Sequence, residues 1–90
     1  MNIFIANLNY RIQDDGLRTL FEDYGEVSSA KIIMDRNTGR SRGFGFVEMP
    51  ADQEAESAIN GLNGSEIEGR NIVVRKARPR TQYMIIRTEQ

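Results

Sequence analysis

Cysteine and histidine are both absent from the 90 residues of this chain. Without cysteine, the protein forms neither a disulfide framework nor a thiolate metal site. Without histidine, it lacks the most common general base and the most common metal ligand. We therefore expect no catalytic residue, no metal site and no cofactor, and these absences weigh against an enzyme.

Long hydrophobic runs are also absent from the sequence. A membrane-spanning helix needs roughly 18 or more apolar residues in succession, and no stretch approaches that length. The N-terminus has neither the basic start nor the apolar run of a secretion signal. The sequence therefore predicts a single-domain cytoplasmic protein that does not enter a membrane.

Charge is unevenly distributed along the chain, although the formal net charge is only −1. Residues 12–26 carry five acidic side chains and one basic, and residues 48–68 carry six acidic and no basic. Residues 70–80 carry five basic side chains and no acidic one, and a second basic cluster consists of Arg36, Arg40 and Arg42. This segregation favours one basic face and one acidic face on the folded protein.

Apolar periodicity predicts four strands and two helices. Alternation and β-branched content indicate strands at 2–6, 27–34, 43–49 and 71–77. Apolar residues at helical spacing predict helices at 14–24 and 51–60. The order β-α-β-β-α-β predicts an α+β fold, the ferredoxin-like sandwich, with a four-stranded antiparallel sheet and two helices on one face. No predicted element is left to cover the other face.

Side-chain parity indicates which residues of the third predicted strand lie on that uncovered face. Phe44 and Phe46 share a face with Glu48, whereas Val47 and Met49 lie on the opposite face. Burying the phenylalanine face would also bury the carboxylate of Glu48 without a partner, which is costly. We therefore expect the phenylalanines to be exposed and Val47 and Met49 to face the core.

The same parity applied to the other strands extends the predicted surface. Core sets are Ile3 with Ile5, Ile32 with Met34, and Ile72 with Val74. The remaining sets combine into a surface of rings and charges that comprises Phe4, Phe44, Phe46, Lys31, Ile33, Arg75 and Glu48. An exposed aromatic patch usually marks a binding site. Rings beside cations suit nucleic acid, because bases stack on rings while cations meet phosphates.

Two segments carry a resemblance to a known family. Ile3-Phe4-Ile5-Ala6-Asn7-Leu8 resembles the hexamer ribonucleoprotein motif of RNA recognition motifs. Arg42-Gly43-Phe44-Gly45-Phe46-Val47-Glu48-Met49 resembles the octamer motif and agrees with it at seven of eight positions. The departures are Met49, where an aromatic is usual, and Gln13, where a helix-capping Thr or Ser is common. The resemblance implies an RNA recognition motif at residues 1–80, followed by a C-terminal tail at residues 81–90.

The resemblance also implies roles for single residues. Phe4 and Phe44 would stack bases, Phe46 would pack against a sugar or between nucleotides, and Asn7 would be mainly structural. Arg42 would pair with a phosphate. The segment from Arg75 to Arg80 would follow the RNA across the sheet edge, which adds three residues to the predicted site: Ala77, Arg78 and Arg80.

The predicted function is the binding of single-stranded RNA without chemistry, with single-stranded DNA as a possible ligand and with roles in post-transcriptional regulation or RNA chaperoning. A protein-interaction module on the same fold is the alternative, and an acylphosphatase-type enzyme is disfavoured because the loop after the first strand has no glycines. The chain resembles the single-motif RNA-binding proteins of bacteria and is expected to be a monomer. For the tail, which contains residues 83–86 with the sequence Tyr-Met-Ile-Ile, three alternatives remain open: a disordered end, an element that covers the sheet, or a strand for self-association.

Overall fold

A computed structural model describes residues 1–77 of the chain. Its elements follow in the order β1 (Asn2–Ala6), α1 (Asp14–Glu22), β2 (Ser29–Met34), β3 (Ser41–Glu48), α2 (Asp52–Leu62), β4 (Glu66–Ile67), β5 (Arg70–Asn71) and β6 (Val73–Ala77). The predicted order of strands and helices is confirmed, with small shifts at the element ends. No helix within residues 1–77 is long and apolar enough to cross a membrane. The predicted tail at 81–90 lies outside the described residues.

The predicted last strand, 71–77, is wrong at its start. β4 and β5 pair with each other as a separate two-stranded sheet, and pairing with β1 begins only at Val73. Glu68 and Gly69 connect β4 to β5 with positive φ angles of 52° and 81°. A two-residue turn of this kind joins strands tightly, but Glu-Gly is a weaker sequence signal for it than Asn-Gly.

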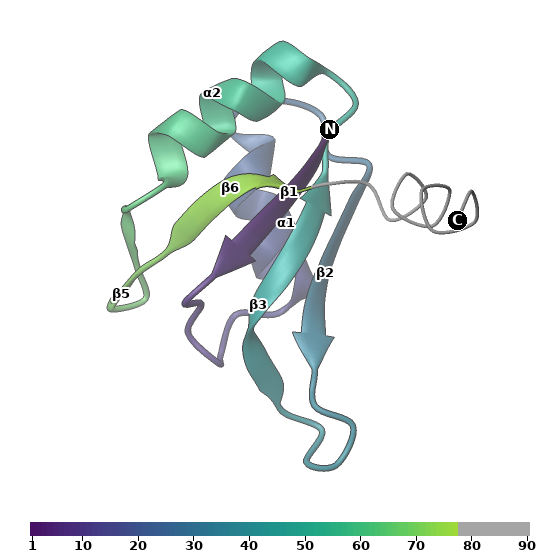
Figure 1. Cartoon of the computed structure of the whole chain (residues 1–90), viewed down its shortest axis with the longest axis vertical. Coiled ribbons are helices and arrows are strands. Elements are labelled where there is room, and N and C mark those ends of the chain that lie inside the picture. Colours follow the sequence, from purple (N-terminus) through teal and green to yellow (C-terminus); the bar gives the residue numbers. More distant parts are fainter. Residues whose placement is uncertain (78–90) are drawn as a thin grey trace, which may run out of the picture.

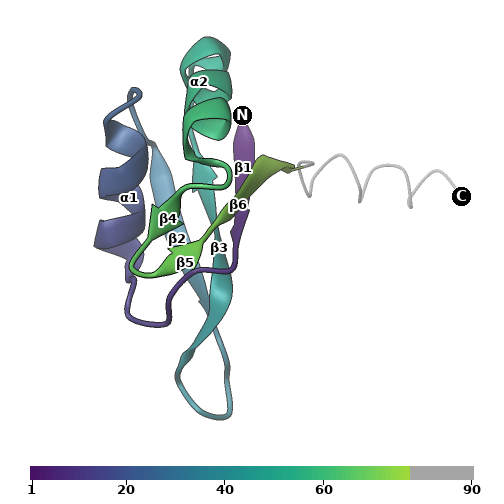
Figure 2. The ribbon, with the colours of Figure 1, turned by 90° about the vertical axis from the view of Figure 1, so that its left-hand side faces the viewer.

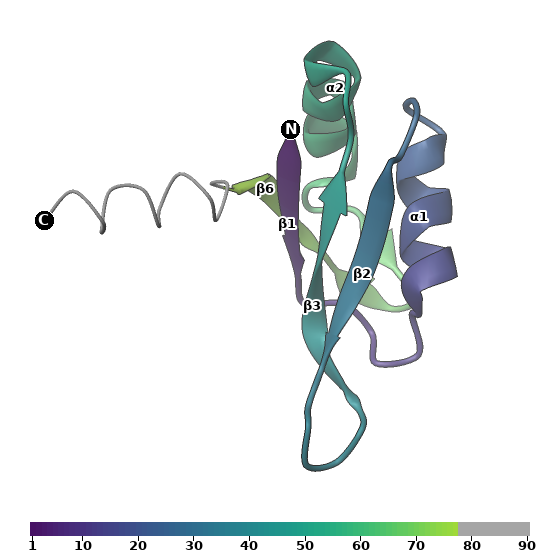
Figure 3. The same ribbon diagram turned by 90° about the vertical axis from the view of Figure 1, so that its right-hand side faces the viewer.

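The main sheet has the strand order β2-β3-β1-β6, and every neighbouring pair is antiparallel. This order places β1 and β3 at the centre, as the predicted sandwich requires. Figure 1 looks onto the sheet with α1 behind it, and Figures 2 and 3 show both helices on one side of the sheet. Within residues 1–77, no element covers the opposite face.

Parity correctly predicted most of the core between the sheet and the helices. Val47 and Met49 of the third predicted strand are 1% and 0% exposed, and Ile3 and Ile5 of β1 are both fully buried. The helices add buried side chains at helical spacing, namely Leu17, Phe21, Ala55, Ala58 and Leu62. No polar or charged side chain is buried within residues 1–77.

The prediction that Met34 belongs to the core is wrong, because its side chain is 51% exposed. The pairing of β2 with β3 shifts register between Ile32, which is 3% exposed, and Met34. A bulge of this kind breaks the strict alternation of faces on which parity depends. The carboxylate of Asp14 on α1 accepts a hydrogen bond of 2.8 Å from the backbone N–H of Ile32, just before the irregularity.

Gly45 lets three elements approach closely at the centre of the fold. A Cβ at this position would lie 2.6 Å from the carbonyl oxygen of Lys31 on β2 and 3.2 Å from the side chain of Leu17 on α1. Only glycine leaves room for both neighbours.

The helix α1 begins without a side-chain cap, since Gln13 makes no capping hydrogen bond.

Candidate nucleic-acid interface

A row of four side chains crosses the uncovered face from one edge of the sheet to the other. Phe4 of β1 stands opposite Phe46 of β3 and opposite Arg75 of β6. Phe46 in turn stands opposite Lys31 of β2. Directly opposite residues of antiparallel strands project from the same face, so this register places two rings between two cations.

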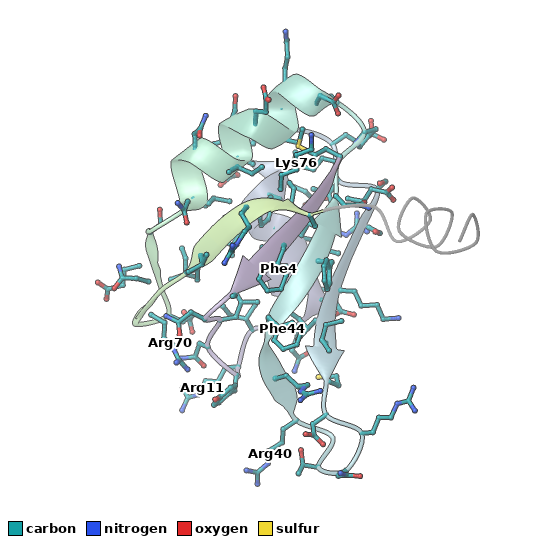
Figure 4. All side chains as sticks on the ribbon, viewed as in Figure 1. Phe4, Arg11, Arg40, Phe44, Arg70 and Lys76 are labelled. Carbon is teal, nitrogen blue, oxygen red and sulfur yellow. The ribbon has the colours of Figure 1, made fainter. Side chains whose placement is uncertain are left out.

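Phe44 completes an aromatic cluster around Phe4. The ring centroid of Phe4 lies 5.9 Å from that of Phe44 and 5.5 Å from that of Phe46, with interplanar angles of 44° and 58°. Phe46 is 38% exposed, and the other two rings are half-buried. Figure 4 shows Phe4 and Phe44 on the two central strands, on the uncovered face. The clustering predicted from parity is therefore present, and it offers flat apolar surface to a ligand.

Arg75 is positioned by the ring beside it. Its guanidinium carbon lies 5.9 Å from the centroid of the Phe4 ring, within the range of a cation–π contact. Arg75 and Lys31 are both exposed, so each can also reach a ligand on the face. The aromatic cluster is thus flanked by positive charge on both sides.

The next row of the sheet ends the predicted surface. Glu48 stands opposite Asn2 of β1 and Ser29 of β2, and Asn2 also stands opposite Ala77 of β6. The hydroxyl of Ser28 donates a hydrogen bond of 3.3 Å to the carboxylate of Glu48. The acidic side chain on this face therefore lies at one end, away from the row that holds Phe4.

The remaining predicted residues are less closely connected to the cluster. Arg42 is exposed and lies two residues before Phe44 on β3. Ile33 is half-buried on β2, beside the register shift. Arg78 and Arg80 lie outside the described residues. The three rings and Arg75 therefore contact one another. Lys31 and Ala77 are placed on the same face by the strand register.

The hairpin between β2 and β3 brings further basic residues near the Arg42 end of β3, opposite the end that holds Glu48. One carboxylate oxygen of Asp35 accepts hydrogen bonds from the backbone N–H of Asn37 at 2.8 Å and of Thr38 at 3.2 Å. These two bonds hold the pKa of the Asp35 carboxyl below its usual value. The ordered turn carries Arg36 and Arg40, which are both exposed.

Parity placed Val73 on the face of Arg75, although the predicted site left it out, and one supporting contact was not predicted. Val73 is 37% exposed and stands opposite Ala6, and the alternation that identified Arg75 also indicates it. Arg70 donates a hydrogen bond of 2.9 Å from Nη2 to the side-chain oxygen of Asn7. Asn7 has a φ of 59° and donates from its side chain to the carbonyl of Asn71 at 2.9 Å. These bonds agree with the structural role that the resemblance implies for Asn7.

No group of three metal-binding side chains occurs within residues 1–77. The face presents aromatic rings and cations on a four-stranded sheet, an arrangement suited to binding by stacking and charge.

A model of the RNA recognition motif family matches residues 3–73 of the chain. "Putative RNA-binding protein RbpB" of Nostoc sp. is 46% identical over 80 residues, which cover 89% of this chain and 78% of that protein. The chloroplastic 29 kDa ribonucleoprotein of Arabidopsis thaliana is 44% identical, over 90% of this chain and 25% of that protein.

Solved structures show the same fold. The crystal structure of RNA binding protein PG1 matches with a TM-score of 0.84 and 51% identity, covering 88% of this chain and 98% of that one. A complex of the Sex-lethal protein with RNA matches with a TM-score of 0.80 and 40% identity, covering 84% of this chain and 47% of that one.

Proposed function

Because the chain belongs to the RNA recognition motif family, we propose that it binds single-stranded RNA on the uncovered face of its sheet. The observation that carries this proposal is the row Lys31–Phe46–Phe4–Arg75, which places two rings between two cations across all four strands. Its chemistry matches the alternating bases and phosphates of an extended strand.

The rings supply most of the binding free energy in this proposal. Bases stack on Phe4 and Phe44, and Phe46 packs against a sugar or between nucleotides. A base stacked on an aromatic ring contributes about 1–3 kcal/mol and accepts many sequences, since every base has a flat face. Two to four nucleotides are expected on the sheet.

The cations hold the backbone of the same strand. Lys31 and Arg75 flank the rings, and Arg42 is exposed on the strand that carries Phe44. Ile33 and Ala77 add apolar contact at the two sides of the face. Arg78 and Arg80 are proposed to continue the basic edge beyond the described residues.

The finer points of the function are proposals of the same kind. The protein binds RNA as a monomer and without chemistry, in the cytoplasm, in post-transcriptional regulation or as an RNA chaperone. The domain extends over residues 1–80, with residues 81–90 as a tail. Relatives from Nostoc sp. support the bacterial character of the protein.

Titration of a fluorescent RNA with purified protein tests the proposal. Phe44→Ala should weaken binding at least about fivefold, the lower limit for one stacked base, and Phe46→Ala should weaken it through the lost packing against a sugar or between nucleotides. Gln53→Ala on the exposed surface of α2 is the matched control and should bind as the parent does. Circular dichroism should show that all four proteins remain folded.

Unchanged binding by the folded Phe44→Ala and Phe46→Ala variants would refute the use of this face. The same titration with the DNA of identical sequence separates RNA from single-stranded DNA as the ligand. Weaker binding of DNA supports a contact with the 2′-hydroxyl, which distinguishes the two. Equal binding of RNA and DNA would mean that only stacking and phosphate contacts hold the strand, without a contact to the 2′-hydroxyl.

A further inference from the structure

Tyr10 lies in the loop between β1 and α1, outside the predicted aromatic face. Its side chain is 64% exposed, the largest exposed fraction of any large hydrophobic side chain within residues 1–77. An exposed tyrosine in a loop is ordinary by itself. This ring differs because neighbours on two sides hold it in one position.

The first neighbour is Gly43, the residue before Phe44. Gly43 is buried and has a φ of 81°, and a Cβ there would lie 3.3 Å from the Tyr10 ring and 3.4 Å from the carbonyl of Leu8. The backbone N–H of Leu8 donates a hydrogen bond of 2.8 Å to the carbonyl of Gly43. The loop is therefore tied to β3, and the ring of Tyr10 packs on the backbone beside the aromatic cluster.

The second neighbour is Arg70, on the β4–β5 hairpin. Its guanidinium carbon lies 5.6 Å from the centroid of the Tyr10 ring, a cation–π contact. Three further hydrogen bonds, each 2.9 Å, hold the hairpin to the loop: Arg70 donates to the side chain of Asn7, Asn7 to the carbonyl of Asn71, and Asn9 to the carbonyl of Glu68. A side chain fixed in this way loses little conformational entropy when it binds a ligand.

Positive charge gathers at the same end of the sheet. Figure 4 shows Arg70 and Arg11 at the end of the sheet near Phe44, with Arg40 on the neighbouring hairpin. Arg11 is exposed and follows Tyr10 directly in the chain. The loops therefore carry an aromatic ring beside cations, which is the same combination as on the sheet.

We propose that Tyr10 and Arg70 form an additional stacking site, which takes one unpaired nucleotide of an RNA strand that leaves the sheet past Phe44. The base stacks on the exposed part of the tyrosine ring, and the guanidinium of Arg70 meets a phosphate. This inference rests on the proposed function, since it extends the same strand. It predicts that the binding site is longer than the sheet alone.

The test compares short and long RNA. Oligouridylate and oligoadenylate of two and nine nucleotides are titrated, the dinucleotides by competition, against the full chain and its variants. Tyr10→Ala should weaken binding of the nonamers at least about fivefold and change that of the dinucleotides less than twofold, because a dinucleotide does not exceed the two to four nucleotides expected on the sheet. Tyr10→Phe keeps the ring and should restore nonamer binding. Gln53→Ala is again the matched control.

Each other outcome has a defined meaning. Equal loss for dinucleotide and nonamer would overturn the additional site, because Tyr10 would then act through the sheet. No loss for either length in folded Tyr10→Ala would also overturn it. Phe44→Ala is measured in parallel: if it fails to weaken either length, the proposed use of the sheet is refuted, independently of the result for Tyr10.

Discussion

Among single residues, the four phenylalanines show that position rather than residue type decides their roles. Phe21 on α1 is fully buried, whereas Phe4, Phe44 and Phe46 lie on the uncovered face. Period-two alternation makes this difference visible in the sequence, because each of these three rings alternates along its strand with isoleucine, valine or glycine. The ring distances are not visible there, since they depend on which residues of β1 and β3 stand opposite each other.

A prediction at this scale concerns Arg75, whose guanidinium lies against the Phe4 ring. Arg75→Ala should lower RNA affinity and reduce the slope of log affinity against log salt by about 0.7, the value for one phosphate contact with a single strand. Arg75→Lys keeps the charge and should keep the slope, although it loses the planar contact with the ring. Fluorescence anisotropy at several salt concentrations measures both quantities. An unchanged slope in Arg75→Ala would show that Arg75 meets no phosphate.

A second residue-scale prediction contrasts two glycines. Gly45→Ala should lower the free energy of unfolding by about 1–3 kcal/mol, because the new methyl group would lie 2.6 Å from the carbonyl of Lys31. Gly16→Ala should raise it by about 0.5 kcal/mol, since Gly16 is inside α1 and its Cβ would meet only Ile12, at 3.6 Å. Urea denaturation monitored by circular dichroism gives both values. Equal effects of the two substitutions would contradict the close approach at Gly45.

At the scale of elements, the sequence predicted the helices and main strands, which follow from apolar periodicity. It did not predict the features that depend on irregular backbone. The two helices and the main strands follow from apolar spacing. The register shift after Ile32 and the β4–β5 hairpin do not, because a bulge breaks alternation and a two-residue strand is too short to show any. The missed hairpin matters for function, since it carries Arg70 to the loop that holds Tyr10.

The β2–β3 hairpin gives a prediction about pH. Because the pKa of Asp35 is lowered in the folded protein, its contribution to the turn is complete above the unfolded value of 3.8 and is lost as the pH falls through the lower folded value. The amide signals of Asn37 and Thr38, which donate to this carboxylate, should therefore shift in NMR spectra as the sample is acidified below about pH 4.

Asp35→Asn should abolish this titration of the two amides. Asp15→Asn on α1 removes one carboxylate elsewhere and serves as the control, so the amides of Asn37 and Thr38 should titrate in it as in the parent. If the two amides shift alike in Asp35→Asn and in the parent, the hydrogen bonds to Asp35 do not order the turn.

At the scale of the whole molecule, the charge segregation seen along the chain becomes a separation in space. α1 carries three acidic side chains and one basic, and α2 carries three acidic and no basic. Both helices lie on one side of the sheet (Figure 3). Lys31 and Arg75 flank the rings on the other side. The net charge of −1 is therefore a poor guide to what an RNA meets on approach, because a strand experiences the near face most strongly.

This separation predicts a strong salt dependence for a protein of almost zero net charge. If Lys31, Arg42 and Arg75 each neutralise one phosphate, log affinity should fall with log salt with a slope of at least about 2 in magnitude, so affinity drops at least about twentyfold between about 50 mM and 200 mM salt. Lys31→Ala should make the slope shallower. The control variant Asp23→Asn also changes the net charge by one unit. Asp23 is exposed on the helix side of the sheet and releases no counterion from RNA, so the salt slope of this variant should match that of the parent. Equal slopes for Lys31→Ala and the parent, or a slope near zero in the parent, would contradict phosphate binding on this face. If Asp23→Asn altered the slope instead, the total charge of the molecule would govern binding rather than the face.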